Sequence, residues 1–132
     1  MNVLHFLKYK KCIFLFSFMF LLLSSCEVLH NFGYPNKVNF RSCGGEIVVS
    51  GDDVFHAVQI ENGNGDCLVH EKGDIAEADT IIIAYDWLTV KYKHYDSKIT
   101  IIAEPNTTHK SRRYYVSFMV KNSLADIKVT QN

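Results

Sequence analysis

The side chains that could carry out chemistry are spread along the chain and do not form a catalytic motif. The acidic ones include the pair Asp52-Asp53 and the group Asp74, Glu77 and Asp79, and a carboxylate pair could serve a hydrolase as acid and base. No Gly-x-Ser-x-Gly elbow and no phosphate-binding loop accompanies them. We therefore interpret these acids as solvated loop residues and predict that the protein is not an enzyme.

The candidate metal ligands lack the spacing that metal sites require. Residues 62–66 read Asn-Gly-Asn-Gly-Asp, like the start of a calcium loop, but Cys67 stands where Gly is needed and Gly73 where Glu is needed. We expect a turn there. The histidines have no i, i+4 partner and no Cys-x-x-Cys companion, so the sequence predicts no metal site and no cofactor. The histidines that follow residue 26 are His30, His56, His70, His94 and His109.

Cys26 has the most suggestive surroundings of the reactive residues. It follows Leu23-Ser24-Ser25, and the four residues resemble the lipobox of bacterial lipoproteins, whose cysteine thiolate takes up a diacylglyceryl group. An apolar run at residues 12–23 precedes it and would be roughly 18 Å long as a helix, which is short of the ~30 Å hydrocarbon core. We predict a signal peptide over residues 1–25 and lipidation at Cys26. An ordinary signal peptide with an incidental cysteine is the alternative.

An acyl anchor at Cys26 would hold the chain on a membrane without spanning it, and several acyl chains are needed for lasting attachment. Loss of the signal peptide removes Lys8, Lys10 and Lys11, which takes the formal charge of the chain from 0 to −3. Nucleic-acid binding is disfavoured, because phosphate contacts require a basic excess. We predict an outer-membrane lipoprotein that faces the periplasm or the cell surface.

Two further cysteines, Cys43 and Cys67, remain in the mature chain. Each lies next to a glycine-containing segment that predicts a turn, where thiols can meet. A disulfide between them would close a loop of about 25 residues and contribute on the order of 3 kcal/mol in an exported protein. Two separate thiols are the equally weighted alternative.

The sequence predicts that short β-strands position these residues. Residues 26–37 hold Gly33, Pro35 and two asparagines, which is typical of a tether. Apolar and polar residues then alternate with period 2, most clearly near the C-terminus, so each strand has one core face. Seven runs without an amphipathic helix predict an all-β, two-sheet sandwich over residues 38–132. The runs are residues 38–40, 46–50, 57–60, 80–92, 98–103, 114–120 and 127–131.

Four short motifs follow one another in the C-terminal half of the chain. They are Trp-Leu-Thr-Val at residues 87–90, Asn-Thr-Thr at 106–108, Arg112 at the start of a strand, and Val-Thr-Gln at 129–131. In this order and spacing they resemble the BACON domain family of Bacteroidetes, and the resemblance covers roughly residues 36–131. It implies an immunoglobulin-like β-sandwich on a secreted or surface protein, often linked to glycan use. The chain departs from the family in its middle, where the usual first Trp is missing.

The residues of these four motifs are interpreted as structural. Trp87 is expected to pack between the sheets, with an exposed sugar platform as the alternative. Asn106 suits a turn, because Asn bonds its own backbone. Either Arg112 or Arg113 is expected to pair with an acid or a loop carbonyl, and Gln131 is expected to bond a neighbouring strand.

The segment Tyr92-Lys93-His94-Tyr95 is predicted to be a hairpin tip, and Tyr92, His94 and Tyr95 are the candidate glycan contacts. Aromatic faces stack on sugar rings, while Lys and His supply hydrogen-bond donors. The alternative is a plain connection whose rings cover the end of the sandwich.

We expect a non-catalytic, membrane-anchored lipoprotein that binds or accompanies glycan. The second hypothesis is a structural or assembly subunit of a cell-envelope complex, which would hold a protein partner by sheet-edge pairing.

Overall fold

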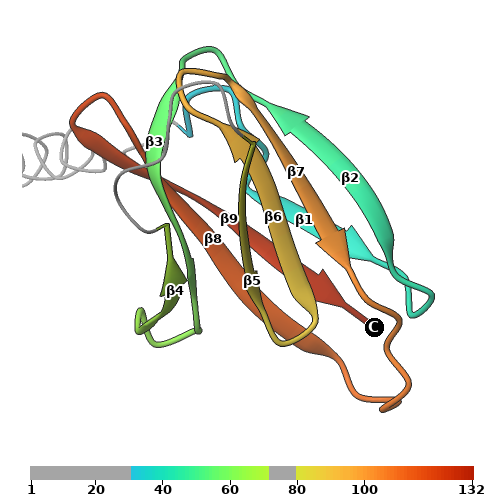
Figure 1. Ribbon diagram of the computed structural model, residues 1–132. Coiled ribbons are helices and arrows are strands. Elements are labelled where there is room, and N and C mark those ends of the chain that lie inside the picture. The colour runs from blue at the N-terminus through green and yellow to red at the C-terminus, as the bar shows by residue number, and fades with distance from the viewer. Residues whose placement is uncertain (1–30, 72–79) are drawn as a thin grey trace, which may run out of the picture.

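The computed structural model describes residues 31–71 and 80–132, which form a two-layer β-sandwich (Figure 1). The predicted signal peptide and the lipidation site Cys26 lie outside the described residues. Within those residues, no helix is long and apolar enough to cross a membrane. The all-β, two-sheet fold predicted from the alternation is confirmed.

The described residues form nine strands, two more than the seven predicted runs. One sheet has five strands in the order β1-β9-β8-β3-β4, and the other has four in the order β2-β7-β6-β5. The β1–β9 pair is parallel and the other pairs are antiparallel. The strands are β1 (Lys37–Phe40), β2 (Gly45–Ser50), β3 (Phe55–Glu61), β4 (Cys67–His70), β5 (Thr80–Tyr85), β6 (Leu88–Lys93), β7 (Lys98–Ala103), β8 (Arg112–Val120) and β9 (Ser123–Gln131).

Two features account for the extra strands. The run predicted at residues 80–92 is divided into β5 and β6 by a two-residue hairpin loop, Asp86-Trp87, across which Tyr85 pairs with Leu88. Asp86 has a φ of 52°, the positive value that such short loops require and that Asp tolerates. The prediction also lacks β4, since its four residues are too few to show an alternation.

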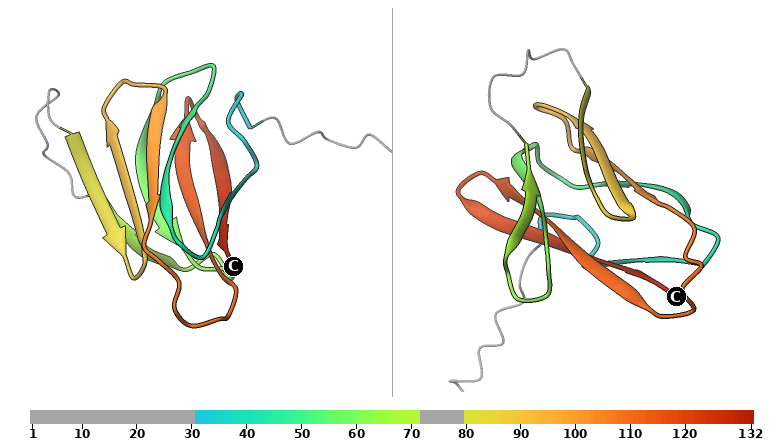
Figure 2. Two further views of the ribbon diagram at one scale, coloured as in Figure 1. Left: turned by 90° about the vertical axis from the view of Figure 1, so that its right-hand side faces the viewer. Right: turned by 60° about the horizontal axis from the view of Figure 1, so that its bottom comes forward.

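The core lies between the two sheets, whose facing surfaces can be seen edge-on in Figure 2. The period-2 pattern places every second side chain there. On β7 the inward residues are Ile99, Ile101 and Ala103, and on β9 they are Ala125, Ile127 and Val129. Aromatic rings fill the end of the core near the β6–β7 connection; they belong to Tyr34, Phe55, Tyr92 and Phe118.

The predicted tether over residues 26–37 is wrong for its described part. Tyr34 is only 4% exposed, and its ring meets Phe118 edge-on with the centroids 4.8 Å apart. Its hydroxyl donates to the carbonyls of Asp53 at 2.8 Å and Ser97 at 3.0 Å. Burial, followed by nearby carboxylates, raises the pKa of Tyr34 to about 12. The composition of this segment suggested a linker, but one buried aromatic ring joins it to the core.

Candidate functional site

The predicted hairpin tip is the connection between β6 and β7, and it does not expose all three candidate rings. Tyr92 is 3% exposed, and its ring packs against Phe55 with the centroids 5.6 Å apart. Its hydroxyl donates to the carboxylate of Glu71. Burial, together with that carboxylate, raises the pKa of Tyr92. Tyr92 therefore has no free ring face for a sugar, because its ring is packed in the aromatic part of the core.

Tyr95 is the exposed ring of the tip. It is 72% exposed, and the half-buried His94 lies between it and Tyr92, at 6.2 Å from the first ring and 6.5 Å from the second. The connection is held at its base, since the Oδ1 atom of Asp96 accepts from the backbone N–H of Ser97 at 2.7 Å. Of the candidate glycan contacts, His94 and Tyr95 remain accessible, and a contact there stays a prediction.

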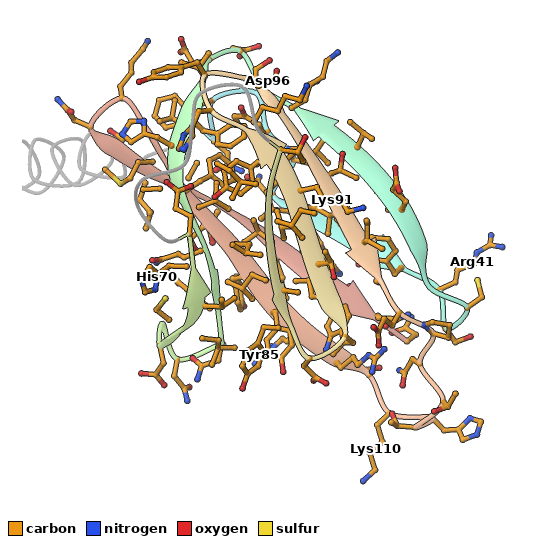
Figure 3. The ribbon with its side chains drawn as sticks, viewed as in Figure 1. Arg41, His70, Tyr85, Lys91, Asp96 and Lys110 are labelled. Carbon is orange, nitrogen blue, oxygen red and sulfur yellow. The ribbon has the colours of Figure 1, made fainter. Side chains whose placement is uncertain are left out.

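The described chain begins at the same end of the sandwich as this tip. The side-chain amide of Asn31 bonds both backbone groups of Asp126, and the hydroxyl of Tyr34 reaches Ser97 next to the tip. Asp96 marks this end in Figure 3, whereas Arg41 and Lys110 mark the opposite end. The C-terminus also lies at that opposite end (Figure 1). A chain tethered through its N-terminal side is thus held by the end that carries Tyr95.

The two cysteines of the predicted disulfide are free and exposed. Cys43 follows β1 and Cys67 begins β4, and β1 and β4 are the two edges of the five-stranded sheet. Four strand spacings of ~4.8 Å separate these edges by roughly 19 Å, whereas a disulfide needs Cα atoms about 4.4–6.8 Å apart. Of the two alternatives, the structure has two separate thiols and no Cys43–Cys67 disulfide, because a shared position near turns does not place two turns together.

The end opposite the tip holds most of the family-like motif residues in a structural cluster. Trp87 is 2% exposed and stacks on Tyr114 with the centroids 5.4 Å apart. The guanidinium of Arg112 lies 4.7 Å from the Trp87 ring and donates to the carbonyls of Glu104 and Pro105. Burial, followed by a hydrogen bond to Asp86, raises the pKa of Tyr114 to about 12. The predicted core role of Trp87 is confirmed, and of the two arginines expected to pair with an acid or a loop carbonyl, Arg112 is the one that bonds loop carbonyls.

The outer face of the five-stranded sheet carries an open concavity of about 560 Å³, which we call the concave face. Two cross-strand rows of side chains form it on β1, β9 and β8. In one row Asn39 pairs with Thr130, which pairs with Arg113; in the other Lys37 pairs with Lys128. The full lining is Lys37, Asn39, Ser111, Arg112, Arg113, Lys128, Thr130 and Asn132.

The polar groups of the concave face present donors. The Thr130 hydroxyl donates to Oδ1 of Asn39, and the Ser111 hydroxyl donates to Oδ1 of Asn132 at 3.2 Å. These two bonds occupy the amide oxygens, and among the described residues the amide NH₂ groups of Asn39 and Asn132 have no partner. A ligand would therefore meet N–H donors and ammonium or guanidinium groups.

Sequence reasoning did not identify the concave face. The alternation on β1 and β9 already places Lys37, Asn39, Lys128 and Thr130 on outward positions. The missing fact is the parallel pairing of these strands, which lie about 90 residues apart in the chain.

Within residues 31–71 and 80–132, no group of three or more His, Cys, Asp or Glu side chains lies close enough together to hold a metal ion.

No curated protein matches the sequence. An NMR structure of a protein from Bacteroides thetaiotaomicron is similar to the chain, with 19% identity and a TM-score of 0.49 over 76% of this chain and 79% of that one. Residues 74–132 match the model of the BACON family, which carries the description "Putative binding domain, N-terminal". The matched segment contains all four motifs noted above. The chain is therefore similar to the BACON family over residues 74–132, the half that holds β5 to β9.

Proposed function

We propose that the protein is a non-catalytic lipoprotein, anchored to the outer membrane through Cys26, that binds glycan on the concave face. The observation that carries the proposal is the donor-lined concavity, whose volume of about 560 Å³ falls in the range of small-ligand sites. Tyr115 pairs with Lys128 and faces the same side, so a half-buried aromatic ring flanks the concavity. A polyhydroxylated ligand is suited by such a combination of a ring face with hydrogen-bond donors.

The position of the concave face also supports this choice over the tip. Cys26 lies five residues before Asn31, so a fully extended connection reaches at most about 17 Å. An acylated Cys26 would keep the Tyr95 end near the bilayer, while the concavity, which includes Ser111 and Asn132, extends to the far end. Glycan has freer access to the part of the concavity at Ser111 and Asn132, which lies far from that end, than to the tip.

Lipidation can be tested by metabolic labelling with radioactive palmitate. We expect label on the full chain, complete loss of label in Cys26→Ala, and unchanged label in Cys43→Ala, because only the lipobox cysteine is acylated. Label that persists in Cys26→Ala would contradict the anchor. Protease shaving of intact cells then distinguishes the cell-surface side, where the chain is digested, from the periplasmic side, where it is protected.

The location of the glycan site can be tested by filling the concavity. Asn39 is exposed, so Asn39→Trp is expected to block the concave face at little cost in stability. It should weaken at least tenfold the binding of a polysaccharide that the unmodified protein binds. Tyr95→Ala is the matched change at the tip and should alter the dissociation constant less than twofold. Isothermal titration of both variants measures the difference. Weaker binding by Tyr95→Ala with unchanged binding by Asn39→Trp would instead place the glycan site at the predicted tip contacts.

Exposed aliphatic residues on edge strands favour the assembly role as the second candidate. Val48 on β2 and Ile82 on β5 are each 59% exposed, and β2 and β5 are the edges of the four-stranded sheet. Edge strands with apolar side chains can pair with another protein. In that case a second envelope protein would co-purify with the chain from detergent extracts in a fixed ratio.

A further inference from the structure

We infer that the concave face selects glycans that carry an anionic substituent, a carboxylate or a sulfate ester. This inference rests on the proposed function and names the class of ligand. The lining contains four cationic residues, Lys37, Arg112, Arg113 and Lys128, and no Asp or Glu. Arg112 is occupied by its carbonyl partners and by Trp87, so the other three are the groups that can receive an anion.

The three cations are not neutralised by any carboxylate that the structure describes. In the described part of the chain, the only ion pair joins Lys121 to Asp53, so no carboxylate lies within 4.0 Å of Lys37, Arg113 or Lys128. Asp126 is the next outward residue on β9 but makes no ion pair with Lys128. Each of the three would gain an ion pair from a bound oxyanion.

The pairing of Lys37 with Lys128 points in the same direction. The two residues are direct partners in the β1–β9 ladder, and like charges in directly opposed positions destabilise a sheet. A bound carboxylate or sulfate between them would turn this repulsion into two attractions. The mature chain carries a formal charge of −3, so this basic surface contrasts with the charge of the protein as a whole.

The uncharged groups add selectivity for an acceptor. The amide NH₂ groups of Asn39 and Asn132 are directed by the hydroxyls of Thr130 and Ser111, which hold the amide oxygens. Hydrogen bonds from N–H donors to an ionised acceptor are about twice as strong as neutral ones. An acidic glycan can meet these donors and the three cations with several carboxylates or sulfates, whereas a neutral glycan gains no ion pair from them.

The test is isothermal titration of the purified full chain in nonionic detergent with three probes. Polygalacturonate carries carboxylates, dextran sulfate carries sulfate esters, and dextran is neutral. We expect at least one acidic probe to bind at least tenfold more tightly than dextran. The double variant Lys37→Gln/Lys128→Gln should weaken that binding at least tenfold and reduce its dependence on salt, because screening acts on the removed charges.

Lys91→Gln is the matched control. Lys91 is half-buried, as Lys128 is, but lies on the outer face of the other sheet (Figure 3). This change should alter the dissociation constant less than twofold, and Trp87 fluorescence verifies that each variant is folded. A preference for polygalacturonate assigns the site to carboxylates, and a preference for dextran sulfate assigns it to sulfate esters.

The outcomes that overturn the inference are separable from failure of the proposed function. Dextran binding as tight as that of both acidic probes overturns the anionic selectivity and leaves the glycan site in place. Equal losses in Lys91→Gln and in the double variant show general attraction to polyanions and overturn the assignment to the concave face. Absence of heat with all three probes overturns the selectivity and counts against glycan binding itself.

Discussion

Replacement of Phe55 by alanine is expected to lower the free energy of unfolding by about 3–5 kcal/mol. Phe55 is 1% exposed and lies at the centre of the aromatic part of the core, with ring centroids 5.5 Å from Phe118, 5.6 Å from Tyr92 and 6.2 Å from Tyr34. Truncation leaves a cavity that these three rings cannot fill without leaving their own contacts. Because domains of this size have about 5–15 kcal/mol of stability in total, the loss is a large fraction.

Guanidinium unfolding followed by the fluorescence of Trp87, the one tryptophan in the chain, measures this change. Val54→Ala is the matched control. Val54 is the adjacent residue and is 48% exposed, so its truncation should change the free energy of unfolding by no more than about 0.5 kcal/mol. Similar effects at the two positions would contradict the assignment of Phe55 to the centre of the core.

The parts of the fold that could be predicted from the sequence depend on local chemistry. Asn106 was expected to bond its own backbone, and its Oδ1 accepts from the N–H of Thr108 at 3.1 Å while its Nδ2 donates to the carbonyl of Lys110. The segment at residues 62–66 forms the expected turn, in which Asn62 Oδ1 accepts from the N–H groups of Asn64 and Asp66. Such residues have few ways to satisfy their polar groups, so their roles follow from their type and neighbours.

The parts that could not be predicted depend on which distant segments lie side by side. Alternation shows that Lys37 and Lys128 point outward but not that they are partners, and it shows that turns flank Cys43 and Cys67 but not that these turns lie at opposite sheet edges. Tyr34 was assigned to a tether because Gly and Pro surround it, although its ring contacts Phe118 across the core. Strand order carries this information, and the spacing of residues within one strand does not.

Replacement of Gln131 by leucine is expected to lower the free energy of unfolding by about 2–4 kcal/mol, because it leaves buried groups unpaired. Gln131 is 0% exposed, and its Nε2 donates to the carbonyls of Arg41 at 3.0 Å and Glu104 at 2.8 Å. Its Oε1 accepts from Nε of Arg112 at 2.9 Å. One amide thus joins the end of β1, the segment after β7 and the start of β8, and leucine retains its approximate size but none of these bonds.

The same substitution at Gln59 separates the lost hydrogen bonds from the change in side-chain type. Gln59 is half-buried on the outer side of β3, and among the residues that the structure describes its side-chain amide bonds only Glu61. Gln59→Leu should therefore cost less than about 1 kcal/mol. Gln131→Leu should also shift the native emission of Trp87, because Arg112 lies over that ring and loses one of its three hydrogen-bond partners. Equal costs for the two variants, with unchanged Trp87 emission, would mean that the Gln131 amide does not hold this end of the sandwich together.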